Sequence, residues 1–268
     1  MQLGGVRLHT VPTAMALLTL LAGAGDRSPA VEQTSLGSGA GHLRTLPQAI
    51  KPPARVRQLV TVTSPAWSST SGTLRAWQRR SGGEWVQVHR VGAIVIGYAG
   101  WVRASQRKQS TGTTPAGMFT LPYAFGRLPG PGGQLSYRQY DRNDWWPYEP
   151  RDPATYNVYQ LHRAARSHWR ASYSEHLADY RRQYAFAVVV GFNLPTGVHY
   201  SARRQQRVAT SPADTSRGGG IFLHVADGGL TAGCVAMPRT DVRWLVRWLD
   251  PDRHPRVAMG PRTYVARL

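Results

Sequence analysis

Apolar residues recur along most of the chain with the two-residue period of β-strands. Six stretches show alternation or a short run of β-branched residues, namely 57–64, 72–80, 84–97, 184–191, 220–226 and 256–260. Ser71-Gly72 and Ser81-Gly82-Gly83 separate the first three stretches and are typical turn residues. The first half of the chain therefore predicts a β-meander, and the later stretches predict strands that complete the sheet.

One segment near the C-terminus has the period of an amphipathic helix instead. Its apolar positions recur at i, i+3, i+4 and i+7, and they are Val242, Leu245, Val246 and Leu249. Thr240-Asp241 can cap the start of this helix, and Asp250-Pro251 ends it. The polar segment 161–182, which carries scattered aromatic residues, is a second candidate for a helix.

Three segments lack a clear period. Residues 113–126 are predicted to form a loop that runs into a short strand, and 203–219 a basic loop. Residues 128–159 are rich in Gly, Pro and aromatic side chains, a composition that disordered segments seldom have. We predict an ordered, aromatic-rich insertion that covers one face of a mainly β domain (β-rich α+β) with one or two helices.

The charge of the chain favours anionic partners. The 33 Lys and Arg residues outnumber the 14 acidic residues and give a formal net charge of +19, whereas 41% of the residues are hydrophobic, enough for a packed core. Such a charge attracts polyanions, among them nucleic acids and the anionic polymers of a cell wall. The basic residues are spread along the chain and form no recognised nucleic-acid-binding motif, so we expect no nucleic-acid partner.

The N-terminus has the features of an export signal. A short apolar run follows Val11 and ends at Ala22-Gly23-Ala24, a small-x-small sequence that a signal peptidase accepts. An uncleaved N-terminal anchor is the alternative. We predict a signal peptide over 1–24, a flexible spacer over 25–54, one folded domain over 55–268, and a location outside the cytoplasm.

The richest chemistry lies in the block 219–239. It holds Cys234, the one cysteine of the chain, which excludes an internal disulfide, and His224 ten positions earlier. A neighbouring imidazole that takes the thiol proton produces the thiolate that attacks carbonyl carbon. Gly233 lets the backbone turn sharply, and its amide is a candidate oxyanion donor. The alternative is that Cys234 and His224 are both buried structural residues.

This block resembles the catalytic domain of the YkuD-type L,D-transpeptidases. The family signature is a His followed, after a loop, by Ser/Thr-x-Gly-Cys, and here His224 precedes Thr231-Ala232-Gly233-Cys234. Other segments that fit the family are 113–119 (with its Pro-x-Gly-x-Phe), 152–153, 156–157, 174–177, 187–193 and 221–225. The resemblance covers roughly 60–260 and is closest to a shorter subfamily that carries Thr-Ala-Gly-Cys.

The resemblance implies a β-sandwich or barrel with a helix after Cys234 and a role in peptidoglycan biosynthesis and cell shape. It also implies that the cysteine attacks the stem peptide beside its terminal D-amino acid, that a thioester forms, and that a neighbouring stem amine resolves it into a 3→3 cross-link. Resolution by water would make the enzyme an L,D-carboxypeptidase, and resolution by a protein amine would anchor proteins to the wall. A non-catalytic wall-binding module of the same fold is a further alternative.

Two positions depart from the usual pattern. Ala232 stands where a basic residue is common, and Ala236 where Arg or Asn is frequent. Arg239 is a candidate replacement for the missing basic group. Further candidates are Thr231 and Tyr123 for substrate binding, Asp227 as orienting partner of the histidine, and Trp145 and Trp146 in the groove. Because no His pair has metal-ligand spacing, we expect no metal and no cofactor.

Overall fold

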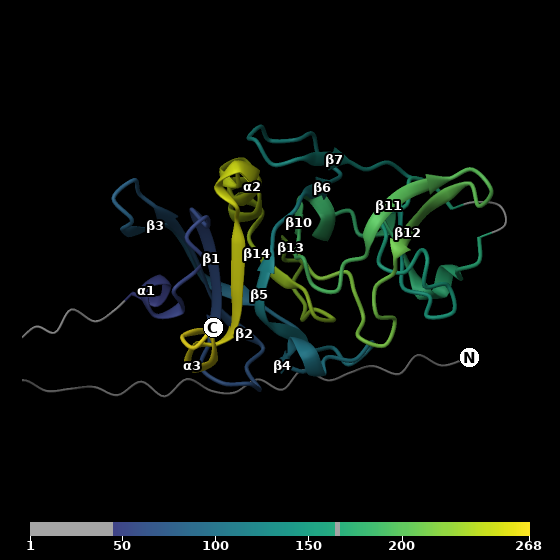
Figure 1. Cartoon of the computed structure of the whole chain (residues 1–268). Helices are drawn as coiled ribbons and strands as arrows, with labels where there is room; N and C mark the ends of the chain where they lie inside the picture. The colour runs from purple at the N-terminus through teal and green to yellow at the C-terminus, as the bar shows by residue number, and fades with distance from the viewer. Residues whose placement is uncertain (1–44, 164–166) are drawn as a thin grey trace, which may run out of the picture. The chain divides into compact units, whose positions relative to one another are not determined.

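A computed structural model describes residues 45–163 and 167–268 (Figure 1). The predicted leader and most of the predicted spacer lie outside this part of the chain. Within it, one mixed sheet has eleven strands, in the spatial order β4 (Trp101–Arg103), β5 (Thr114–Thr120), β15 (Arg256–Pro261), β1 (Gln58–Ser64), β2 (Ser71–Arg79), β3 (Trp85–Val95), β14 (Val235–Met237), β13 (Phe222–Val225), β10 (Ala187–Val189), β6 (Ala124–Gly126) and β7 (Tyr137–Gln139).

The remaining elements are short. Two antiparallel strand pairs lie outside the main sheet, β11 (Thr196–Ser201) with β12 (Gln206–Ser211), and β8 (Trp145–Pro147) with β9 (Ser174–His176). The α-helices of the described residues are α1 (Leu46–Ile50), α2 (Arg239–Trp248) and α3 (Arg262–Val265). The 3₁₀ helices there are η1 (Ala104–Gln106), η2 (Ala171–Tyr173), η3 (Leu177–Asp179), η4 (Gln183–Ala185) and η5 (Pro251–Arg253).

The strands that meet in the sheet divide their side chains between its two faces. Val60 of β1, Leu74 of β2, Val188 of β10 and Leu223 of β13 belong to one buried cluster, although their strands lie far apart in the strand order. A single sheet can bring these residues together only by curling around a common core. The predicted mainly β fold is confirmed.

Helix α2 closes one side of this core. Its four predicted apolar positions are all buried, each at most 1% exposed, and the helix packs against β10 and β13. The predicted capping by Thr240-Asp241 is wrong, because Pro238 is the N-cap residue and makes no side-chain cap bond. Asp241 lies in the first turn, where its carboxylate pairs with His89 of β3 at 2.7 Å.

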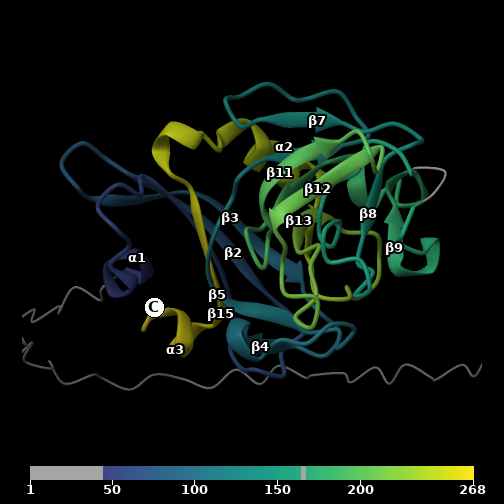
Figure 2. The same ribbon diagram turned by 45° about the vertical axis from the view of Figure 1, so that its right-hand side comes forward.

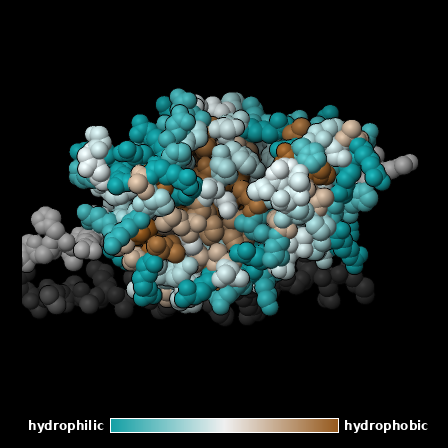
Figure 3. All heavy atoms as spheres, in the orientation of Figure 1, coloured by the Kyte–Doolittle hydropathy of each residue, from teal (hydrophilic) through white to brown (hydrophobic). Residues whose placement is uncertain are grey.

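The opposite faces of the sheet are covered by different elements. On the β1–β2–β15 side, Leu59 and Trp77 pack with Leu46 of α1 and Val265 of α3, so residues assigned to the spacer contribute to the ordered domain. Figure 2 shows α1 and α3 on this side and the β8–β9 region on the other. In Figure 3, apolar residues gather in the middle of the visible face, over β15 and β5, and polar residues surround them.

An aromatic cluster covers the outer face of β10 and β13. Phe125 lies at its centre, with ring centroids 5.1–6.4 Å from those of its neighbours Tyr140, Trp146, Tyr159, Tyr184 and Phe222. Three of these rings come from 128–159, as predicted for an ordered insertion over one face. The cluster forms the floor beside which the site described below is built.

Other expectations need correction. Residues 114–120, predicted as a loop, form β5, which is fixed between β4 and β15. In the described part of 161–182 there is no α-helix, but η2, β9 and η3. Residues 206–211 of the predicted basic loop 203–219 form β12, whose alternation is short and lies among Arg, Ser and Thr residues. Among the described residues, no helix has the length and apolarity needed to cross a membrane.

Candidate active site

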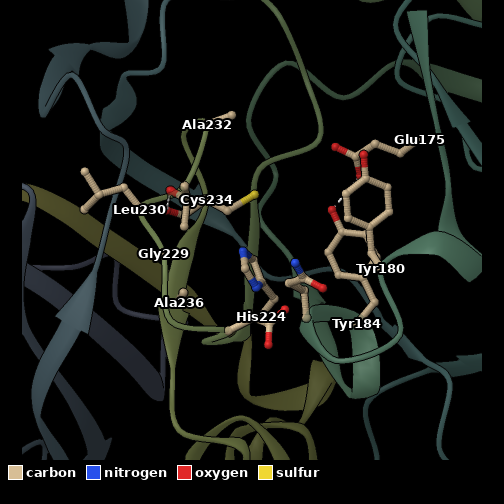
Figure 4. A pocket seen from close by; sticks show the side chains of 12 residues that line it. Glu175, Tyr180, Tyr184, His224, Gly229, Leu230, Ala232, Cys234 and Ala236 are labelled. Carbon is tan, nitrogen blue, oxygen red and sulfur yellow. Dashed lines mark hydrogen bonds between the residues drawn. The ribbon is translucent and has the colours of Figure 1, made fainter. Parts of the chain in front are cut away.

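The sheet places His224 and Cys234 on the same face. Strands β13 and β14 pair in parallel with Leu223 opposite Val235 and His224 opposite Ala236. Leu223 and Val235 both point into the curled core, so their neighbours point to the other face, towards the aromatic cluster. His224 near the end of β13 and Cys234 just before β14 therefore become neighbours, and Figure 4 shows the imidazole directed towards the sulfur.

The Cys234 thiol contacts the backbone at the start of β13. Its sulfur accepts the backbone N–H of Phe222 at 3.4 Å, and the thiol donates to the carbonyl oxygen of Gly220 at 3.2 Å. The residue is partly buried, and its open side faces the cavities described below. The backbone thus fixes the sulfur before any substrate arrives.

The tautomer of His224 is set by the backbone. Its Nδ1 lies 2.9 Å from the carbonyl oxygen of Val225, which can only accept, so Nδ1 carries the proton and Nε2 is free to act as a base. The ring is buried and makes an edge contact with Tyr184 at 5.7 Å. Asp227, the candidate orienting partner, lines the cavity and pairs with Arg182 at 3.6 Å.

Both groups rest in their neutral forms. Burial lowers the pKa of His224 to about 4, with the Val225 carbonyl opposing this shift. Burial raises the pKa of the Cys234 thiol to about 12, and the charge of Glu175 adds to this, whereas the Phe222 amide and Arg107 lower the pKa. At neutral pH the site therefore holds a thiol and a neutral imidazole, not a standing ion pair. Proton transfer must accompany the attack on the substrate.

The loop before the cysteine is held by Thr231. Its hydroxyl donates to the carbonyl oxygen of Cys234 at 2.6 Å and accepts the amide of Gly233 at 3.3 Å. The backbone of Thr231 is fixed from outside the loop, because Tyr98 donates its amide to the Thr231 carbonyl at 2.9 Å. Thr231 is thus a positioning residue for the nucleophile.

Gly233 cannot be replaced by another residue without strain. Its φ is +139°, and a Cβ atom would lie 2.8 Å from the carbonyl oxygen of Thr113 and 3.1 Å from Nη2 of Arg107. The tight approach brings the backbone of the cysteine loop against two buried groups. The Gly233 amide, the predicted oxyanion donor, rests on the Thr231 hydroxyl in this state.

Arg107, directly after η1, is a basic residue close to Cys234. It is 5% exposed, and its guanidinium donates to the carbonyls of Thr113 at 3.0 Å and Arg217 at 2.6 Å. Its charge lowers the pKa of Cys234. The sequence led us to expect this basic group at Arg239. Arg107 was missed, because no pattern around it relates it to Cys234, which lies 127 positions later.

Two cavities meet at Cys234. The first, of about 270 Å³, lies on the His224 side, and the second, of about 180 Å³, lies on the Arg107 side. Cys234, Ala232 and Glu175 line both. A substrate that approaches the sulfur therefore meets the Glu175 carboxylate from either direction.

The other predicted site residues lie elsewhere. Tyr123 and Arg239 line neither of these two cavities; Tyr123 packs on the aromatic cluster, and Arg239 is exposed at the start of α2. Trp146 is fully buried in the same cluster, and Trp145 stacks on His176. In the described ranges, no three His, Cys, Asp or Glu side chains are placed to hold a metal ion.

Comparison with protein families gives a match over most of the domain. A family model described as the L,D-transpeptidase catalytic domain, YkuD, matches residues 70–259, more than half of the chain. The match includes His224, Thr231 and Cys234 and both cavities. Neither the curated proteins nor the solved structures gave a match.

Proposed function

Because this chain belongs to the L,D-transpeptidase (YkuD) catalytic domain family, we propose that Cys234 is the nucleophile and His224 the base of its reaction. Membership implies L,D-transpeptidase-type activity on peptidoglycan stem peptides, outside the cytoplasm. The observation that carries the assignment is the shared face of β13 and β14, on which the free Nε2 of His224 is directed to the sulfur.

The first half-reaction transfers the stem acyl group to the enzyme. As the thiol attacks the carbonyl before the terminal D-amino acid, Nε2 takes its proton and a C–S bond forms. The C–N bond then breaks, and the imidazolium gives the proton to the leaving amine. Since the resting pKa values favour neutral groups, the imidazolium forms only with the developing charge of the transition state. A thioester and a free D-amino acid result.

The negative charge on the carbonyl oxygen needs donors. The amides of Cys234 and Gly233 are the candidate donors, and the bond from the Gly233 amide to the Thr231 hydroxyl is long at 3.3 Å. We expect the Gly233 amide to exchange this bond for the oxyanion, where a donor in a desolvated site contributes most. Arg107 favours the same charge from the second cavity.

The second half-reaction determines which product the enzyme makes. Attack on the thioester by a stem-peptide amine yields the 3→3 cross-link, whereas attack by water yields an L,D-carboxypeptidase. The presence of two cavities at the sulfur supports transfer between two peptides, because a donor and an acceptor chain need separate approaches. We propose export by the predicted leader as the route to this substrate.

The direct test uses a disaccharide tetrapeptide. We expect the full chain to release D-alanine and to form an acyl-enzyme that gains the mass of the tripeptide donor, and Cys234→Ala to do neither. A carbapenem should add to the native protein and not to this variant. Undiminished D-alanine release by Cys234→Ala, with unfolding unchanged, would contradict the assignment.

The same assay examines Arg239 and Tyr123, two of the three substrate contacts predicted from sequence; the third is Thr231. A raised KM with unchanged kcat in Arg239→Ala or Tyr123→Phe would support contact with the distal part of a donor. Normal kinetics in both variants would limit donor binding to the two cavities.

A further inference from the structure

Glu175 is an acid that the reaction described above does not use. It is the carboxylate that lines both cavities at Cys234. Figure 4 shows Glu175 on the wall across from Cys234 and Ala232, beside Tyr184. Its position beside the reacting sulfur indicates a role in the reaction.

The fold holds this carboxylate in place. Glu175 is the middle residue of β9, paired with Trp146 of β8, which is itself fixed in the aromatic cluster. The hydroxyl of Tyr184 donates to Oε2 of Glu175 at 2.5 Å. A strand, a buried tryptophan and a hydrogen bond thus fix the direction of the side chain.

A second tyrosine lies near the carboxylate, and its hydroxyl lacks a well-formed hydrogen bond within the described residues. The Tyr148 hydroxyl lies close enough to Glu175 to lower the pKa of the carboxyl. This hydroxyl is buried, yet no group of the described residues forms a hydrogen bond of good geometry with it. It lies against Gly220, whose carbonyl accepts the Cys234 thiol. The wall beside the sulfur therefore holds an unused polar group in addition to the acid.

The surroundings of Glu175 are poor in positive charge. Its charge acts on Tyr148, Tyr180, Tyr184 and Cys234, and no ion pair of Glu175 occurs within the described residues. His224 and Asp227 line the first cavity with it, and Arg107 and Tyr156 line the second. The Arg107 guanidinium makes its hydrogen bonds with the carbonyls of Thr113 and Arg217 and forms no ion pair with Glu175. Burial raises the pKa of Glu175 to about 7. A carboxylate without a cation in such a wall is complementary to a cationic ligand.

We propose that Glu175 binds the primary ammonium of the acceptor beside the thioester and takes one proton from it. This inference rests on the proposed function, because it concerns the second half-reaction. The donor thioester occupies the sulfur at that stage, and an acceptor reaches it past the Glu175 wall in either cavity.

The protons of this step balance. Glu175 accepts one proton from the ammonium, and the free amine attacks the thioester carbonyl, forming a C–N bond. His224 takes the second proton from the nitrogen of the tetrahedral adduct and delivers it to the sulfur as the C–S bond breaks. The products are an amide, the Cys234 thiol, a neutral imidazole and a protonated Glu175, which returns its proton to water.

A second base solves a specific difficulty. An amine at neutral pH is almost wholly an ammonium ion and cannot attack until it loses a proton. His224, with a pKa lowered to about 4, is a poor acceptor for that proton. A carboxylate with a raised pKa is nearer to the pH at which the enzyme must work. Water is neutral when it binds and has no such proton to lose. Glu175 therefore favours transfer to an amine and has little effect on hydrolysis.

The test follows the two half-reactions of the full chain separately. In Glu175→Gln, which keeps the size and the bond from Tyr184, we expect acylation by the tetrapeptide, read as D-alanine release, within about threefold of the native rate. Transfer of the acyl group to a disaccharide-peptide amine should fall at least about 100-fold, the usual contribution of a general base. Hydrolysis of the thioester should change little, and the ionisation near pH 7 should disappear from the pH profile of transfer.

Matched variants separate a chemical role from a structural one. Glu149→Gln removes another buried carboxylate, which pairs with Arg170 outside both cavities, and should leave the ratio of transfer to hydrolysis unchanged. Glu175→Asp should restore part of the transfer. Equal loss of acylation and transfer in Glu175→Gln, or unchanged transfer, would overturn the inference. Failure of Cys234→Ala to abolish acylation would instead overturn the proposed function itself.

Discussion

Replacement of Thr231 by Val tests how the cysteine loop is held. Valine keeps the shape of the side chain, so no cavity forms, but the 2.6 Å bond to the Cys234 carbonyl and the 3.3 Å bond from the Gly233 amide are lost. A buried group left without a partner costs about 1–3 kcal/mol, and the longer bond lies at the low end of this range. We expect the free energy of unfolding to fall by about 2–4 kcal/mol.

The same change should slow the chemistry. A nucleophile displaced by a fraction of an ångström loses rate steeply, so acylation by the tetrapeptide should fall about 10–100-fold. Thr231→Ser is the matched control, because it keeps the hydroxyl and loses one methyl group; we expect a cost of about 1 kcal/mol and acylation within about threefold. Urea unfolding and single-turnover D-alanine release measure both quantities. A valine variant as stable as the serine variant, or one that acylates at the native rate or faster, would refute the reasoning.

Three further predictions concern neighbouring groups. Gly233→Ala should cost about 2–4 kcal/mol and most of the acylation rate, because the new Cβ meets the Thr113 carbonyl at 2.8 Å in a strained conformation, whereas Gly228→Ala, with open space around it, should cost about 1 kcal/mol in urea unfolding. Because His224 is buried with its pKa lowered from 6.5 to about 4, its contribution to stability is complete above pH 6.5 and is lost as the pH falls towards 4; native protein should lose about 3 kcal/mol more than His224→Gln over that interval. Arg107→Gln should raise the pKa of Cys234 and slow alkylation by iodoacetamide roughly threefold to tenfold at pH 8, with Arg107→Lys close to native; equal rates in all three proteins would exclude the electrostatic role.

Most of the fold could be predicted from the pattern of hydrophobic residues. The alternation of β1, the short apolar run of β13 and the apolar face of α2 were enough to predict these elements. Both strands are buried along their whole length, so the polar positions of β1 lie in the interior as well. β5 was missed because Pro115 and Gly117 are turn signals, and only its pairing with β15 shows why a strand forms there. β12 was missed because its exposed positions carry the same polar residues as a loop.

The site was predictable where chemistry and sequence are adjacent. His224 and Cys234 stood out because the predicted export signal, a single thiol and the Gly-Cys turn agree with one another. The segment around Glu175 fitted the family pattern, but nothing in it said that the acid would face the sulfur. Arg107 and Tyr148 line the second cavity from segments that are far from Cys234 in sequence. No local pattern in the sequence predicts such contacts. Arg239, close in sequence, is exposed at the start of α2 and lines neither of the two cavities.

The connection between His224 and Cys234 is fixed at both ends and open in the middle. The Ala226 amide donates to the Met237 carbonyl at 2.8 Å, and Tyr98 fixes Thr231. Between these anchors, Gly228 and Gly229 have nothing within 4 Å of where a Cβ would lie. Because parallel strands set the distance between base and nucleophile, residues added at 228–229 would raise the rim of the first cavity without moving either group. The domain thus offers a site at which the reach of the enzyme can be redesigned independently of its reactivity.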